Sequence, residues 1–117
     1  MKIYNFERAI EGPENRFATD EEFRKASIIG KEDSPVLDRA GVVLMDMGDG
    51  EVAMGKEEFH SFIVGESGCG KTRRVVIPTI DMVSRTKKES MVIADPKGEI
   101  YEATAATLRK RGYTVYR

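Results

Sequence analysis

The residues best suited to chemistry form one glycine-rich stretch that ends in a lysine and a threonine. Eight consecutive residues fit the pattern GxxxxGK[ST] at every fixed position: Gly65, Glu66, Ser67, Gly68, Cys69, Gly70, Lys71 and Thr72. Glycines allow backbone conformations that a side chain would obstruct, so successive N–H groups can converge on phosphate oxygens. Lys71 would direct its charge at the β- and γ-phosphates, and the Thr72 hydroxyl would be a ligand of Mg²⁺. The pattern predicts a nucleotide-binding loop, with Lys71 as a catalytic residue and Thr72 as the metal ligand.

A second candidate is the aspartate that follows the apolar run 91–94. In a parallel sheet this end of a strand lies beside the phosphate loop. A carboxylate there can organise Mg²⁺, so Asp95 is a candidate catalytic residue. The alternative is that Asp95 caps the turn before the next helix, with Pro96 fixing that turn. The residues alone leave both interpretations open. Glu99 fits an acidic residue in the first turn of that helix, where the helix dipole favours it.

The elements expected to position these residues alternate between strand and helix. The sequence predicts strands over 62–64, 91–94 and 113–116, and helices over 71–77 and 100–111. Pro78 is expected to kink or end the first helix, since an interior proline costs about 3 kcal/mol. That helix would then resume over 80–83. This alternation is typical of a parallel sheet with crossover helices.

The residues upstream predict a short helix and a hairpin. Thr19 and Glu22 have the spacing of a capping box, which predicts a helix over about 20–29 that stops at Gly30. Two apolar runs flank a Gly-Asp-Gly turn, which predicts a β-hairpin. Its strands would cover 42–45 and 51–54.

The predicted fold class is therefore α/β. Residues 1–40 form an irregular and helical N-terminal extension in this interpretation, with 1–18 irregular. Residues 41–117 form the hairpin and the first half of a P-loop nucleotide-binding domain with an incomplete parallel sheet.

Composition restricts the other possibilities. The chain has 117 residues and a net charge of −1, so attraction to a polyanion would have to be local. Three short basic clusters, at 71–74, 85–88 and 109–111, would contact DNA phosphates as one stripe only if the fold brought them together. One cysteine allows no internal disulfide. Apolar runs are too short to span a bilayer, so the chain is expected to be cytoplasmic.

The phosphate loop, the Val-Ile-Pro-Thr segment at 76–79 and the Asp-Pro-Lys-Gly-Glu motif at 95–99 together resemble a known family. They are similar to the type IV secretion coupling proteins, the TraG/TraD-like conjugative DNA-transfer ATPases. The likeness extends over about residues 15–117. FtsK-like DNA translocases share an Asp-Pro-Lys motif at a similar place and are the nearest alternative.

The resemblance implies a RecA-like ATPase that binds ATP and Mg²⁺ and assembles as a hexamer at the inner membrane. Such a ring would move single-stranded DNA, or a relaxase–DNA complex, with other secretion-system subunits. Gly65 to Thr72 would be the nucleotide site, and residues 95–99 the second nucleotide-proximal motif. The Walker B acidic pair of the family lies beyond the position where this sequence stops. The resemblance therefore does not make Asp95 the main Mg²⁺-organising aspartate. A nucleotide-binding module or a truncated interaction protein without ATP turnover is the alternative function.

Overall fold

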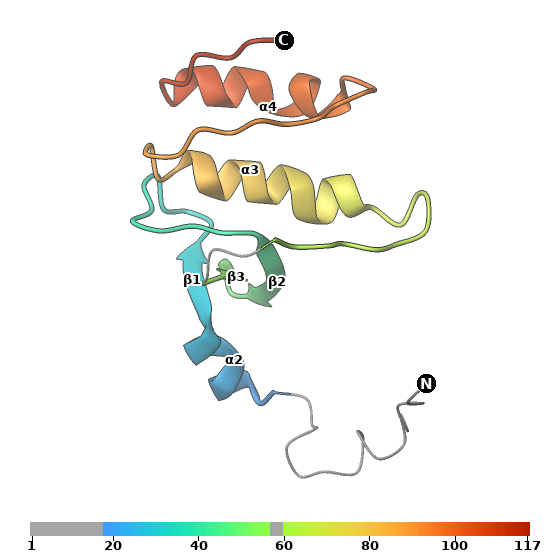
Figure 1. The fold of residues 1–117 in the computed structure, drawn as a ribbon. Helices are drawn as coiled ribbons and strands as arrows, with labels where there is room; N and C mark the ends of the chain where they lie inside the picture. The colour runs from blue at the N-terminus through green and yellow to red at the C-terminus, as the bar shows by residue number, and fades with distance from the viewer. Residues whose placement is uncertain (1–17, 57–59) are drawn as a thin grey trace, which may run out of the picture.

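A computed structural model describes residues 18–56 and 60–117 of the chain. Figure 1 shows an antiparallel sheet, helix α3 and helix α4 stacked in that order, with helix α2 beyond the sheet. The elements in chain order are α2 (Asp20–Ala26), β1 (Ser27–Lys31), β2 (Val43–Gly48), β3 (Glu51–Gly55), η1 (Thr72–Val76), α3 (Ile77–Ser84) and α4 (Glu99–Lys110). The α/β class predicted from the sequence is confirmed. Most of the predicted irregular segment 1–18 lies outside the described residues.

Helix α2 begins as predicted and ends early. The capping box is present: the Glu22 N–H donates to Thr19 Oγ1, and the Glu22 carboxylate accepts from the Thr19 N–H. The prediction that the helix reaches residue 29 is wrong, because the chain becomes strand β1 at Ser27. Ile28 and Ile29 are β-branched and favour a strand when a partner strand is available. Gly30 is a strand residue rather than a helix stop, and a Cβ there would lie 2.7 Å from Met54 Cε.

Strands β2 and β3 form the predicted hairpin. Gly48, Asp49 and Gly50 all have positive φ angles, as the tight turn requires. The sheet order is β1-β3-β2, and both pairings are antiparallel. Strand β3 is therefore central, and three of its five residues, Val52, Ala53 and Met54, are among the buried apolar residues.

The helix after the phosphate loop continues through Pro78 to Ser84, so it does not end at the proline, whereas a kink there stays a prediction. It begins with the π-helical turn η1, in which the N–H of Ile77 donates to the carbonyl of Thr72. Pro78 lies where η1 passes into α3, next to the turn in which the hydrogen-bond pattern changes. The change of hydrogen-bond pattern from η1 to α3 therefore accommodates the proline.

The three segments predicted as parallel strands are not strands in this structure. Residues 62–64, 91–94 and 113–116 are outside any ladder. Several of their apolar side chains are exposed, Phe62 at 92% and Val92 fully so. A strand exists only where a neighbouring backbone lies at hydrogen-bonding distance, and these segments have no ladder partner among the described residues; most of their residues line grooves instead. Helix α4 occupies nearly the predicted range.

The core lies between the sheet and α3. Side chains from β2, β3 and α3 form one buried cluster, with partly buried residues from β1 and the β1–β2 connection packed around it. The cluster comprises Val43, Val52, Met54 and Met82, surrounded by Ile28, Leu37 and Ala40. The Val43 N–H also donates to Thr79 Oγ1 at 3.0 Å, so β2 is tied to α3 by a directed bond. The helix that carries the phosphate loop thus rests on the sheet.

We expect Met54→Ala to lower the free energy of unfolding by about 2–5 kcal/mol, because the Met54 side chain is fully buried and its removal leaves a cavity. Met45→Ala on strand β2 is the matched control. Met45 is half exposed, so its truncation should change stability by less than about 0.5 kcal/mol. Urea denaturation followed by circular dichroism measures both. Equal losses for the two variants would contradict this assignment of the core.

Candidate nucleotide-binding site

The glycine-rich loop folds around the ammonium group of Lys71. Lys71 Nζ donates to the Gly65 carbonyl at 2.5 Å and to the Glu66 carbonyl at 2.8 Å. It also lies 3.7 Å from Cys69 Sγ. The lysine predicted to bind phosphate is therefore held inside the loop, and its positive charge is at the centre of the loop.

Three glycines give this loop its shape. Gly68 and Gly70 have φ angles of 82° and 88°, in the left-handed region that side chains rarely adopt. Gly65 is needed for a different reason, because a Cβ at this position would lie 2.5 Å from Cys69 Sγ. The glycine positions of the sequence pattern thus correspond to two left-handed conformations and one close approach.

The loop leads directly into η1. The Arg74 N–H donates to the Gly70 carbonyl at 2.8 Å, and η1 begins at Thr72. A loop that enters a helix in this way presents unpaired N–H groups and the positive end of the helix dipole to the same region. The structure therefore gives the loop the local setting that an anion requires.

Thr72 and Asp95 line one groove. The groove has a volume of about 750 Å³ and lies between the η1–α3 helix and the segment 92–97. Thr72, Val76 and Thr79 line one side of it, and Asp95 and Lys97 line the other. Two motifs that are more than twenty residues apart in the sequence therefore face the same space.

The Asp95 carboxylate acts as a cap for α4. Oδ1 accepts from the Gly98 N–H at 3.1 Å, and Oδ2 accepts from the Tyr101 N–H at 2.8 Å. Gly98 has a φ of 79° and is buried, which lets the chain turn into the helix. This geometry agrees with the capping interpretation of Asp95, whereas a role in catalysis or Mg²⁺ binding stays a prediction. Glu99 is exposed in the first turn of α4, as expected.

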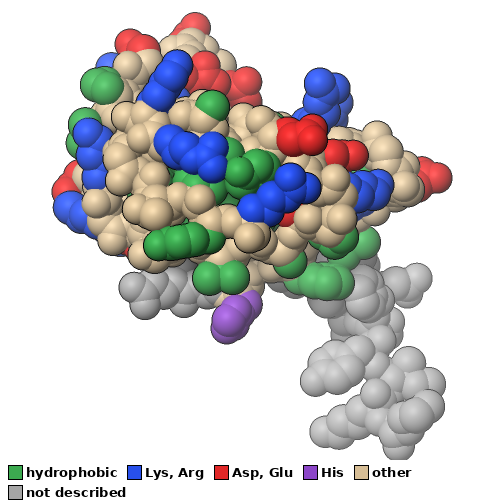
Figure 2. Space-filling view, turned by 90° about the horizontal axis from the view of Figure 1, so that it is seen from above, with side chains coloured by type: hydrophobic (Ala, Val, Ile, Leu, Met, Phe, Trp, Pro, Cys, Tyr) green, Lys and Arg blue, Asp and Glu red, His purple; other side chains and the backbone are tan. Residues whose placement is uncertain are grey.

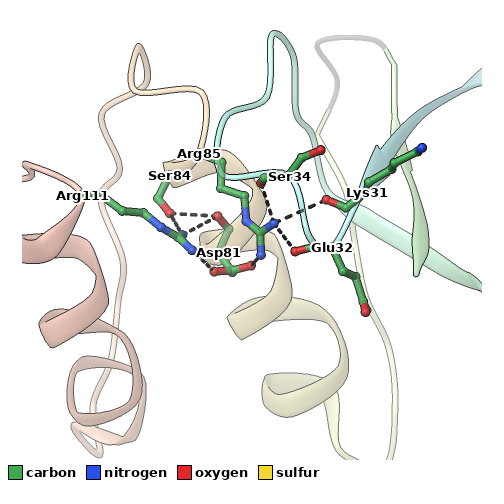
Figure 3. Close-up of polar contacts among 7 residues, drawn as sticks. All are labelled: Lys31, Glu32, Ser34, Asp81, Ser84, Arg85 and Arg111. Carbon is green, nitrogen blue, oxygen red and sulfur yellow. Dashed lines mark hydrogen bonds and ion pairs between the residues drawn. The ribbon is translucent and has the colours of Figure 1, made fainter. Parts of the chain in front are cut away.

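Sequence reasoning missed a polar cluster that joins the sheet, α3 and α4 (Figure 3). The Asp81 carboxylate accepts from Arg85 Nη2 at 2.6 Å and from Arg111 Nη2 at 2.7 Å. Arg85 Nη1 also donates to the backbone carbonyls of Lys31, at the end of β1, and of Glu32 and Ser34 in the β1–β2 connection. The i, i+4 spacing of Asp81 and Arg85 was a signal for one of these pairs. Arg111 is thirty residues from Asp81, so no local pattern could identify the other.

The basic clusters do not merge into one stripe. Arg85 and Arg111, from two of the three clusters, meet at Asp81 and are largely occupied there. Figure 2 shows the face over α4 with Lys and Arg side chains interspersed among Asp and Glu. This face therefore lacks the uniform positive charge that nucleic-acid binding by electrostatics alone would need.

Metal-binding clusters and membrane-spanning helices are both absent from residues 18–56 and 60–117. Groups of three or more metal-binding side chains do not occur among them. Within the same residues, no helix combines the length and apolar character that crossing a bilayer requires.

The described residues thus define an α/β protein in which a glycine-rich loop with a central lysine enters a helix. The protein family described as Type IV secretory system Conjugative DNA transfer matches residues 16–117, and the chain belongs to this family. The resemblance found in the sequence is confirmed, over nearly the same residues. Comparison with curated proteins and with solved structures gave no match.

We expect Asp95→Ala to lower the free energy of unfolding by about 1 kcal/mol, because two N–H groups at the start of α4 lose their acceptor. Asp95→Asn should lose less, since an amide oxygen can still accept. Asp33→Ala is the control, an exposed aspartate in the β1–β2 connection. Thermal or urea denaturation measures all three. A loss from Asp95→Ala no larger than that from Asp33→Ala would contradict the capping role.

Proposed function

We propose that residues 65–72 bind the phosphates of ATP, and that the chain is the nucleotide-binding part of a coupling ATPase for conjugative DNA transfer. Membership of the DNA-transfer family supports the second part of the proposal. The observation that carries the first is the position of Lys71 Nζ, which is bonded to the Gly65 and Glu66 carbonyls inside a loop built on left-handed glycines.

The bonds of Lys71 suggest how phosphate would enter. In this structure, neutral carbonyl oxygens accept from the ammonium group. Phosphate oxygens carry full negative charge and form shorter and stronger hydrogen bonds to a cation. A triphosphate would therefore take over donors of Lys71, while the loop N–H groups and the start of η1 stabilise the remaining charge.

Magnesium fits this arrangement through Thr72. The Thr72 side chain lies at the start of η1 and lines the groove that Asp95 and Lys97 also line. A hydroxyl oxygen is a suitable ligand for Mg²⁺, which usually keeps several waters and takes its other ligands from substrate phosphates. When bound, the ion would neutralise charge on the phosphates. Both Asp95 oxygens already accept backbone N–H groups, so we assign Thr72 rather than Asp95 as the direct ligand.

The wider assembly follows the family. We propose that the full protein works as a ring, with a parallel P-loop sheet, at the inner membrane and moves single-stranded DNA or a relaxase–DNA complex together with other secretion-system subunits. The family match favours this over the FtsK-like alternative. For the chain itself, ATP binding without turnover is the competing function. Hydrolysis needs a group that orients water, and the acidic residues that line the groove with Thr72 are Asp95, which caps α4, and Glu99, which is exposed.

We expect Lys71→Ala to weaken Mg²⁺-ATP binding by roughly thirtyfold or more, since a charged donor to phosphate is worth about 2 kcal/mol or more. Isothermal titration calorimetry on the purified chain measures the affinity. Lys110→Ala is the matched control, an exposed lysine in the last turn of α4, and should bind like the parent. Parent protein that binds no ATP, or equal affinity in Lys71→Ala, would overturn the proposal.

The same proteins decide between binding and turnover. If the chain is a catalytic unit, phosphate release from Mg²⁺-ATP should occur with the parent and the Lys110→Ala control and be lost with Lys71→Ala. Binding that depends on Lys71 without phosphate release would identify the chain as a nucleotide-binding module.

A further inference from the structure

The polar cluster formed by Asp81, Arg85 and Arg111 joins the C-terminal ends of α3 and α4. The N-terminal ends of both helices lie on the side of the candidate site. Figure 1 shows α3 and α4 running in the same direction, so both start on the side of the phosphate loop. Asp81 lies near the end of α3, and Arg111 is the residue after the end of α4. Arg111 bonds the Asp81 carboxylate, the Asp81 carbonyl and the Ser84 hydroxyl, so one guanidinium is fixed at three points.

The starting ends of the same helices are not bonded to each other. The groove separates Thr72, at the start of η1, from the turn 95–98 that precedes α4. Among the described residues, hydrogen bonds between residues 65–76 and residues 92–99 are absent. The spacing of the two motifs must therefore be set elsewhere in the helix pair.

Apolar contact alone does not fix that spacing. Ile80 of α3 and Ala105 and Leu108 of α4 are buried, but hydrophobic contact is non-directional. Paired hydrogen bonds from a guanidinium to a carboxylate have a defined direction. Helix α4 has 12 residues, a length of about 18 Å, so a tilt of about 10° at Arg111 would move its start by about 3 Å.

We propose that Asp81 is a positioning residue of the nucleotide site. By holding Arg111, it fixes the angle of α4 against α3 and thereby the distance between the phosphate loop and the turn 95–98. By holding Arg85, it ties the same point to the sheet, so that the helix pair has one fixed end and one open end. This inference rests on the proposed function for its consequence, which is that correct spacing lets both motifs contact one nucleotide.

The experiment uses the single cysteine of the chain. Cys69 is exposed in the phosphate loop and accepts one spin label, and Lys97→Cys, at an exposed position within the turn 95–98, accepts the second. Double electron–electron resonance then measures the distance distribution between loop and turn without nucleotide. The parent should give one narrow distribution. Asp81→Asn should broaden it by roughly 3 Å, the displacement expected for a small tilt of α4.

Asp38→Asn is the matched control, because the same substitution removes an exposed ion pair with Lys88 and leaves the helix pair alone. Its distribution should stay narrow. Without labels and with Lys97 restored, Asp81→Asn should bind Mg²⁺-ATP about tenfold more weakly than Asp38→Asn, within the usual range of coupling between sites. All measurements are made at a temperature where circular dichroism shows each variant to be folded.

A narrow distribution in folded Asp81→Asn would overturn the inference, whatever the loss of stability, since a merely structural role does not predict movement at the far end. Broadening with unchanged ATP affinity would also overturn it. If Asp81→Asn does not fold, Arg111→Lys provides the same test from α4, because one ammonium group cannot keep all three bonds. Failure of the parent to bind ATP would refute the proposed function, while the distance distributions would still decide whether Asp81 holds the spacing.

Discussion

Two arginines share the carboxylate of Asp81, and the arrangement of the three layers depends on this sharing. Arg85 is the more buried of the two, with 12% of its side chain exposed, and its Nε has no partner among the described residues. A guanidinium so placed is tolerable only while its other donors are satisfied. Asp81 and the carbonyls of the β1–β2 connection satisfy them. The cluster is thus closer to a buried ion pair, whose disruption costs several kcal/mol, than to a surface ion pair, which contributes about 1 kcal/mol or less.

The polar cluster at Asp81 adds directed contacts between the sheet and the helices, whose shared apolar core is modest. The sheet contributes Val52 and Met54, and α3 contributes Met82. Such a cluster is small for the length of the chain, and several apolar side chains stay in contact with solvent. Directed bonds at Thr79 and Asp81 supply the orientation that a small apolar contact leaves undetermined.

Features that depend on neighbouring residues could be predicted from the sequence, and features that depend on distant partners could not. The capping box at Thr19, the hairpin turn around Asp49 and the glycine conformations of the phosphate loop all arise within a few residues. Strand β1 was missed because Ile28 and Ile29 also fit a helix, and only pairing with β3 decides between them. The prediction of parallel strands was wrong for the converse reason. Apolar, β-branched residues at 62–64 and 91–94 favour a strand only where a partner strand lies alongside, and none does in the described part of the chain. Lys71 was predicted as a ligand of phosphate, but its present bonds to loop carbonyls could be seen only in three dimensions.

The wide turn η1 has a consequence for how this segment tolerates change. A π-helical turn holds one residue more than an α-helical turn, so η1 (Thr72–Val76) absorbs an extra residue within the turn itself. Thr79 and Met82 therefore keep the direction toward the sheet that a continuous α-helix would give them. Removing one residue from η1 would restore an α-helical turn and leave the sheet-facing side of α3 nearly in place, whereas the same removal inside α3 would rotate every later side chain by about 100°. The start of this helix therefore tolerates a change of length that its regular part does not.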